Sequence, residues 1–334
     1  KCILYDKRGM NVNRFLIQYR ESDWEFIKRV AGYAGVAVIA EERAAGRNIC
    51  FGYPETIKLE SIETDSFDVI QNYEEYQKRK IKNNNGITNN DLYSYKVKSR
   101  KIYRLGKTVI LQGKRLIRGK ICSCLAGQEL QHTYILLSRV MGTCSEEDNI
   151  NITGASLKAN VVHVDKAKAL IKIQLDENAD NAGNRWFDFA TVYSTSDGTG
   201  WYCMPEVGDE VRLVFPDKSE ENAYVSSCVH IENESRMNPD EKSWKNKQGK
   251  EVLFTPETLV LRNNKGMSIE ISDVEGIKIV SDKKIILQAA EDINVNSESG
   301  LQLSAAESML LSQGGASIQM NDSITIGGGK IYMN

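Results

Sequence analysis

The sequence predicts a mainly β protein whose last third is a regular repeat of short strands, and three observations support this. Val, Ile and Thr alternate with polar residues through most of the 334-residue chain, as they do in half-buried strands. Helical periodicity is confined to two stretches near the N-terminal end. Pairs of apolar residues, one residue apart, recur at intervals of eight and start at Ile269, Ile277, Ile285, Ile293, Leu301 and Met309.

The first region combines strands with a short helix. Residues 14–19, RFLIQY, are predicted to form a strand. Ser22 and, three residues later, Glu25 form the capping-box pattern of a helix start, and Gly35 stands where this helix is expected to end. A second helical stretch covers residues 71–80, and the strand patterns that follow are typical of an antiparallel meander within a small barrel.

The middle of the chain predicts a second, smaller barrel. The stretches SLKANVVHVDKAKALIKIQL, RWFDFATVYS, VRLVF and AYVSSCV supply five short strands without a helical pattern, which suits a Greek-key barrel of the OB type. Polar stretches on either side mark its limits. We therefore predict a first barrel domain at 1–144, a linker at 145–154, an OB-fold domain at 155–230, a connector at 231–251 and the repeat region at 252–334.

The eight-residue repeat predicts a β-helix or prism. Residues at i and i+2 lie on one face of a strand, and polar or small residues between the pairs suit corners. Because two inward side chains per eight residues leave a narrow core, three chains close it better than one and leave few strand edges open. We expect an intertwined trimeric β-helix, a triangular prism, with this core: Ile269, Ile271, Ile277, Ile279, Ile285, Leu287, Ile293, Val295, Leu301, Leu303, Met309 and Leu311.

The repeat loses its period after Leu311. Three further pairs follow at uneven intervals, with glycines between them: Ile318 and Met320, Ile324 and Ile326, Ile331 and Met333. This suits a tapering end of the prism. An ordinary antiparallel sheet is the alternative, since alternating apolar residues also suit half-buried strands.

Composition restricts the classes of function. With 43 basic and 45 acidic residues the net charge is −2, which argues against a nucleic-acid binder. No apolar run approaches the roughly 20 residues that span a bilayer, and no signal-peptide pattern is present, so we expect assembly in the cytoplasm. Seven cysteines and three histidines show no metal-ligand spacing. We predict no metal, no cofactor and no catalytic residue, and we expect that the natural protein begins before Lys1.

Three stretches of the sequence resemble one protein family. FLIQYRESDWEFIKRVAGYAGV is similar to a hub motif in which a strand precedes a capped helix. GWYCMPEVGDEVRLVF is similar to the OB-domain signature of the same family, through Gly200, Trp201, Pro205, Gly208 and Asp209. Together with the eight-residue repeat, they make nearly the whole chain resemble the VgrG proteins of type VI secretion and the related hub-spike proteins of contractile phage tails and tailocins.

The signature also has a physical interpretation. Gly208 suits a turn with positive φ ahead of the strand VRLVF. Trp201 and Tyr202 are candidates for packing inside the barrel. Asp209 and Glu210 fit solvated charges in a surface turn better than a catalytic pair.

The resemblance implies a structural homotrimer, the central spike of a contractile tail, whose needle pierces a target envelope. Its hub, residues 1–144, would contact the tail tube or tube initiator and baseplate proteins, and a PAAR-like tip protein would cap the needle. Contact with the envelope would be transient, and nucleic acid would not be a partner. Such a spike is part of a phage tail, tailocin or secretion particle that is released or injected. Family hubs begin with another barrel, so the resemblance also implies a missing N-terminal part.

Two other functions remain open at this stage. A lysozyme-type, cell-wall-degrading trimeric spike would need an acid pair or nucleophile in a pocket, for which the sequence shows no constellation. A glycan-binding tail fibre or adhesin would suit a trimeric prism, but Tyr332 is the single aromatic residue after residue 268.

Overall fold

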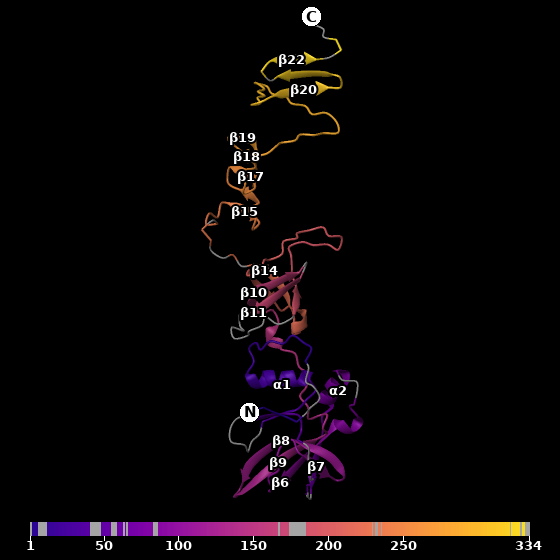
Figure 1. The fold of residues 1–334 in the computed structure, drawn as a ribbon. Coiled ribbons are helices and arrows are strands. Elements are labelled where there is room, and N and C mark those ends of the chain that lie inside the picture. The colour runs from indigo at the N-terminus through magenta and orange to yellow at the C-terminus, as the bar shows by residue number, and fades with distance from the viewer. Residues whose placement is uncertain are drawn as a thin grey trace. The chain divides into compact units, whose positions relative to one another are not determined.

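The structure is a computed structural model, and it confirms a mainly β fold (Figure 1). It describes residues 2–5, 12–40, 48–54, 59–62, 64, 66–82, 86–165, 168–173, 185–228, 230, 233–234, 236–320, 322–327 and 329–330. The chain divides into two compact units, residues 1–231 and 232–334, which are described separately below. The predicted pair Ile331 and Met333 lies outside the described residues.

The hub part of the first unit holds the helices α1 and α2 and two sheets. The helices are α1 (Asp23–Tyr33), α2 (Tyr73–Lys82) and the 3-10 helix η1 (Asn89–Leu92). The strands are β1 (Cys2–Leu4), β2 (Val38–Ala40), β3 (Ile49–Phe51), β4 (Glu60–Ser61), β5 (Phe67–Gln71), β6 (Tyr93–Ser99), β7 (Thr108–Leu111), β8 (Lys114–Ala126) and β9 (Glu129–Leu137). A small sheet has the order β1-β3-β2, and a six-stranded sheet has the order β4-β7-β8-β9-β6-β5.

The six-stranded sheet curls into a half-barrel. All its neighbouring strands are antiparallel except β4 and β7, and a register shift between Arg118 and Lys120 interrupts the long β8–β9 ladder. Such a bulge adds bend and twist to a strand. The curl encloses a core of Ile62, Tyr95, Val97, Tyr103, Val109, Leu111, Leu116, Tyr134 and Leu136.

Helix α1 begins at the capping box that the sequence predicts. The Ser22 hydroxyl accepts a hydrogen bond from the Glu25 backbone N–H, and the Glu25 carboxylate accepts one from the Ser22 N–H at 2.8 Å. Two backbone donors that the helix leaves open are thereby satisfied. The helix ends before Gly35, whose φ of +65° suits a residue without a side chain.

Residues 14–19 do not form the predicted strand, because side chains rather than a neighbouring strand satisfy their backbone. Glu221 accepts from the Phe15 N–H at 2.9 Å, and Arg29 donates to the Ile17 carbonyl at 3.0 Å. Alternate residues still point one way, since Phe15, Ile17 and Tyr19 pack against the core of the next domain. The alternation thus identifies the buried side of this segment, but the backbone hydrogen bonds of the segment are not those of a sheet.

The rest of the first unit is the OB-type barrel. Its sheet has the order β12-β11-β10-β13-β14. A parallel bridge from Phe189 to Val225, with the Ala190 N–H donating to the Val225 carbonyl at 2.7 Å, ties the end of β12 to β14. The elements are η2 (Ile150–Ile152), β10 (Ser156–Asp165), β11 (Lys168–Ile173), β12 (Trp186–Asp188), β13 (Glu210–Val214), η3 (Glu220–Asn222) and β14 (Tyr224–Cys228).

The second unit, residues 232–334, consists of two antiparallel meanders separated by a long stretch without strands (Figure 1). The first meander contains β15 (Lys242–Lys245), β16 (Glu251–Phe254), β17 (Thr258–Arg262), β18 (Ser268–Ser272) and β19 (Gly276–Val280). Residues 281–308 contain no strand. The second meander contains β20 (Met309–Gln313), β21 (Ala316–Met320) and β22 (Ile324–Gly327).

The described residues of this unit do not form a β-helix. The first two apolar pairs of the repeat lie on β18 and β19, which pair with each other as in an ordinary antiparallel sheet. The next three pairs lie in the strand-free residues 281–308. In an intertwined prism, each apolar pair would lie on a short strand whose hydrogen-bonded neighbours belong to other copies of the chain. One chain alone cannot form such a ladder of backbone hydrogen bonds.

Candidate functional site

The sheet β15–β19 has one apolar face, and this face is the candidate functional site. Side chains alternate between the two faces of a strand, and the antiparallel register lines them up in rows across the sheet. Two rows of cross-strand neighbours make up the apolar face: Trp244, Val252, Leu261, Ile269 and Ile279 in one row, and Phe254, Leu259, Ile271 and Ile277 in the next. In the second row, the β15 neighbour is Lys242.

The apolar face is open to solvent in the single chain. Trp244 is 59 % exposed, Ile277 72 % and Ile279 54 %. An apolar groove of about 580 Å³ runs over the first row, past Trp244 and Leu261. Soluble proteins rarely leave an apolar patch larger than a few hundred Å² uncovered unless another surface binds there.

The opposite face of the same sheet carries charged residues, together with Leu253 and Val260, which lie across from each other in the ladder. Arg262 donates to the Glu251 carboxylate at 2.7 Å, and Glu270 lies directly across from Lys278 in the ladder. The two apolar rows therefore lie on one face of the sheet, and these charged residues lie on the other.

The structure brings four predicted core residues onto the apolar face: Ile269, Ile271, Ile277 and Ile279. Five further residues join them, namely Trp244, Val252, Phe254, Leu259 and Leu261. Sequence reasoning missed these five, although 252/254 and 259/261 are apolar pairs of the same kind at uneven intervals. Strand β15, with Trp244, lies inside the stretch predicted as a connector.

The other predicted core residues are not gathered into one site. Six of them lie in the strand-free stretch, with exposed fractions from 54 % to 74 %: Ile285, Leu287, Ile293, Val295, Leu301 and Leu303. Met309 and Leu311 lie on β20, across from Met320 and Ile318. These four share one face of the second meander, on which Leu311 is 52 % and Ile318 40 % exposed. The second meander repeats the amphipathic design of the first.

The OB signature forms a turn that is bonded to β10. Gly208 has a φ of +98°, and its N–H donates to the Val161 carbonyl at 2.8 Å. The Val161 N–H donates in return to the Asp209 carbonyl at 2.9 Å, and the Asp209 carboxylate accepts from the Glu206 N–H at 2.8 Å. Pro205 is buried beside this turn. These contacts give Asp209 a structural role in the turn.

The signature aromatics lie on the surface, not inside the barrel as the sequence suggested. Trp201 is 54 % and Tyr202 76 % exposed. They belong to a hairpin that leaves the barrel between β12 and β13, and Gly200 in this hairpin has a φ of +134°. A Cβ at position 200 would lie 2.3 Å from the Tyr193 carbonyl oxygen, so the tight return of the hairpin requires glycine. The barrel interior is filled instead by aliphatic residues together with Phe187 and Phe215.

A buried ion triad joins helix α1 to the barrel. The Arg29 guanidinium donates to Glu21 at 2.6 Å and to Glu220 at 2.7 Å. The three side chains are only 5 %, 8 % and 2 % exposed, respectively. Sequence reasoning missed Arg29 because a lone arginine in a helix looks like an ordinary surface residue.

The stretch predicted as a linker, 145–154, is bonded on both sides. The Asp148 carboxylate accepts from the Tyr33 hydroxyl at 2.9 Å and pairs with Lys218 at 3.0 Å. The Asn149 side chain donates to the Tyr19 carbonyl at 2.8 Å. Burial, and secondly the hydrogen bond to Asp148, raise the pKa of Tyr33 to about 12. Hub and barrel are thus held together along this stretch.

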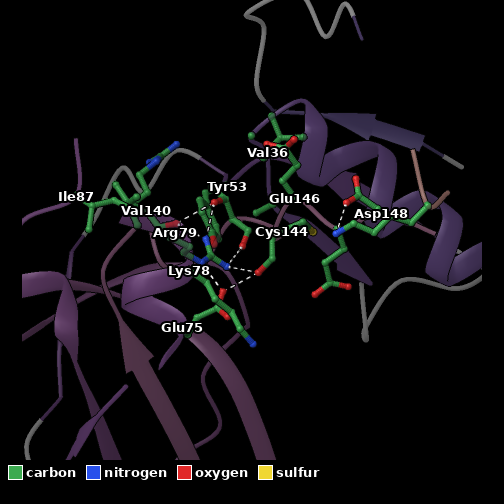
Figure 2. Close-up of a pocket in the computed structure, with 18 of the residues that line it drawn as sticks. Val36, Tyr53, Glu75, Lys78, Arg79, Ile87, Val140, Cys144, Glu146 and Asp148 are labelled. Carbon is green, nitrogen blue, oxygen red and sulfur yellow. Dashed lines mark hydrogen bonds and ion pairs between the residues drawn. The ribbon is translucent and has the colours of Figure 1, made fainter. Parts of the chain in front are cut away.

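A cleft of about 880 Å³ lies beside α2 and the start of this stretch (Figure 2). Arg79 lines this cleft and donates to the Thr143 carbonyl, the Ser145 hydroxyl and the Glu75 carboxylate, at 2.6–2.9 Å. Burial raises the pKa of the Cys144 thiol, which disfavours the reactive thiolate. The hydrogen bonds of Arg79 connect α2 to residues 140–145, so the polar groups in this cleft have a structural role.

A family comparison identifies the barrel. Residues 157–230 match the family model of the type VI secretion system/phage-baseplate injector OB domain. The barrel is thus similar to the OB domains of these injectors. This match confirms, at the barrel, the resemblance to VgrG-like spike proteins.

Among solved structures, the chain is similar to a complex of the Francisella proteins PdpA and VgrG. The match has 8 % sequence identity and a TM-score of 0.37, and it covers 73 % of this chain and 59 % of that one. The chain therefore spans less than two thirds of that protein's length. Curated proteins yield no match. In the described part of the chain, no helix is long and apolar enough to cross a membrane.

Proposed function

We propose that three copies of this chain form the central spike of a contractile injection machine, with residues 252–334 as the needle that enters the target envelope. The observation that carries the proposal is the apolar face of β15–β19, which one chain leaves open. Identical copies can cover it, because each brings the same apolar surface and the same paired charges on its outer side.

The proposal calls for three copies rather than two. Two amphipathic sheets could stack face to face as a sandwich, and that would cover β15–β19 alone. The exposed pairs between Ile285 and Leu303 recur every eight residues with short polar corners between them. Three chains wound around one axis give the strand of each of these apolar pairs a neighbouring strand on both sides. The prism would then bury these side chains, as the packed sheets β15–β19 would bury the apolar face. The resemblance to VgrG-like spikes points to the same number.

The first unit supplies the base of the spike. The Arg29 triad and the bonded stretch 145–154 make hub and barrel one body, so force applied to the hub reaches the barrel without bending a loose linker. We propose that residues 1–144 meet the tail tube or tube initiator and the baseplate, and that a tip protein covers the far end of the needle. The particle that carries the spike is a phage tail, a tailocin or a secretion machine.

The experiment replaces the wild-type chain, in cells that make the particle, by Ile277→Asp or by Val274→Asp. Ile277 is on the apolar face, whereas Val274 is 80 % exposed in the turn between β18 and β19. We expect the Ile277→Asp particles to lose activity against target cells and the Val274→Asp particles to keep it. Full activity of a variant shown to be monomeric would refute the proposal.

A further inference from the structure

The hairpin that carries Trp201, here called the arm (residues 191–203), is an ordered part of the OB barrel. Ser194 bridges Gly200, and the Trp201 N–H donates to the Tyr193 carbonyl at 2.8 Å. The turn is closed by the Thr195 N–H, which donates to the Thr199 carbonyl at 2.9 Å. The arm therefore holds its shape without resting on the barrel core.

The arm is apolar on both of its faces. The register of the Ser194–Gly200 bridge sets Tyr193 across from Trp201 and, on the opposite face, Val192 across from Tyr202. The exposed fractions are 49 % and 54 % for the first pair and 93 % and 76 % for the second. Large apolar side chains at this exposure on an ordered ribbon are typical of a surface that another protein covers.

The composition of the arm favours a protein as the occupant. Between Thr191 and Met204 the single charged residue is Asp197, which is satisfied inside the turn by Thr195 and Thr199. Aromatic residues and Met are enriched, and charged residues depleted, at the centre of protein interfaces. A nucleic acid or an anionic membrane surface would call for basic side chains, which the arm lacks.

The barrel also leaves apolar side chains exposed outside the arm. Among its described residues outside the arm, two large apolar side chains are exposed, Val207 at 64 % in the signature turn and Trp186 at 41 % on β12. In the proposed trimer the barrels are tethered to a common needle by the short stretch from Cys228 to Lys242. Such tethering gives a high effective concentration, so a modest contact between neighbouring barrels suffices.

We propose that the arm packs on the OB barrel of a second copy of this chain, where Trp186 and Val207 receive it. The inference rests on the proposed trimer and adds to it an interface in the base of the spike. The needle and the arms then join the copies at two separate places along the chain.

Photo-crosslinking of the purified full chain tests the contact. p-Benzoylphenylalanine (Bpa) is introduced as Tyr202→Bpa, with Ile81→Bpa on α2 as the matched control, since Ile81 is 81 % exposed. After irradiation we expect covalent dimers and trimers from the first variant and uncrosslinked chain from the second. The crosslinked peptides should contain Trp186 or Val207. A sample that is trimeric by light scattering but crosslinks only within one chain refutes the arm contact and leaves the trimer standing. A monomeric sample refutes both.

The native thiols give a second measurement. Cys203 at the base of the arm and Cys124 on β8 are both exposed in the single chain. In the assembled protein we expect maleimide to label Cys203 at least tenfold more slowly than Cys124. The double variant Val192→Ser, Tyr202→Ser should restore the Cys203 rate to that of Cys124. Equal labelling of the two thiols in the wild-type trimer would overturn the contact.

Discussion

The barrel and the first meander use the same kind of strand but differ in where their apolar side chains go. On β13 of the barrel, Val211 and Leu213 are 0 % exposed, because they lie in a core cluster built by the barrel strands and by Phe15, Ile17 and Tyr19 of the same chain. On β19 of the meander, Ile277 and Ile279 alternate in the same way and are 72 % and 54 % exposed. Alternating apolar residues therefore identify the apolar face of a strand. They do not tell whether the same chain or another copy covers that face.

The charged residues follow the same division. The first unit encloses Arg29 and Glu220 almost completely, which is tolerable when partners are fixed within a closed interior. In the second unit the paired charges, such as Arg262 with Glu251, lie on the face away from the apolar rows. The buried charges of the first unit thus join distant parts of one chain, whereas the Arg262–Glu251 pair links two neighbouring strands of one sheet.

The largest effect is expected from Ile285→Asp in the needle. In a prism it sets three carboxylates on the axis, where burial of unpaired charge costs several kcal/mol for each group. The needle should then fail to assemble, while the first unit stays folded. Sedimentation velocity and circular dichroism of the full chain would show this as a monomer with retained barrel signal. An unchanged trimer would mean that Ile285 points outward.

A smaller but still large effect is expected from Arg29→Ala in the first unit. It leaves the buried carboxylates of Glu21 and Glu220 without their cation, which costs about 3–5 kcal/mol of unfolding free energy. The control is Arg100→Ala, since Arg100 and Glu129 form an exposed pair worth at most about 1 kcal/mol. Urea denaturation of each variant measures the difference. Equal losses for the two variants would contradict a structural role for the triad.

Tyr33 predicts a pH dependence confined to the first unit. Its folded pKa of about 12 lies above the value of 10.0 for an unburied tyrosine, so the folded state holds the proton more tightly. The stabilisation is complete below pH 10 and is lost as the pH rises from 10 to 12. We expect the urea midpoint of Tyr33→Phe to fall less steeply over this interval than that of the wild type. If the urea midpoints of the two proteins fell equally steeply between pH 10 and 12, the raised pKa of Tyr33 would be contradicted.

The smallest effect is expected from Ser22→Ala, which removes the helix cap at the start of α1. The loss is about 1 kcal/mol, and it should lower the midpoint of the first unit while the mass of the assembly stays unchanged. Differential scanning calorimetry measures the midpoint of the first unit, and light scattering measures the mass of the assembly. A change in oligomeric state would show that α1 also takes part in the contact between copies.

Local chemistry explains which features the sequence predicts. Ser22, Glu25 and Gly208 act through neighbours a few residues away, and the structure has both the capping box and the positive-φ turn. The strand predicted at 14–19 is wrong because its backbone partners, Arg29, Asn149 and Glu221, lie 12, 130 and 206 residues away, beyond the reach of a local pattern.

The aromatics mark the other limit of prediction from sequence. Trp201 looks like a core residue by type, and only the hairpin register shows that it lies outside the barrel. Trp244 was missed because β15 is short and charged at both ends, so its place beside Val252 depends on the fold of the meander.

The most direct test of the account is the solution mass of the full chain. Size-exclusion chromatography with multi-angle light scattering should give three times the 37.5 kDa of one chain. In the same sample, hydrogen exchange should show protection across residues 269–311. A folded monomer with those residues equally protected would contradict the account, because the apolar face of β15–β19 would then be covered without a second copy.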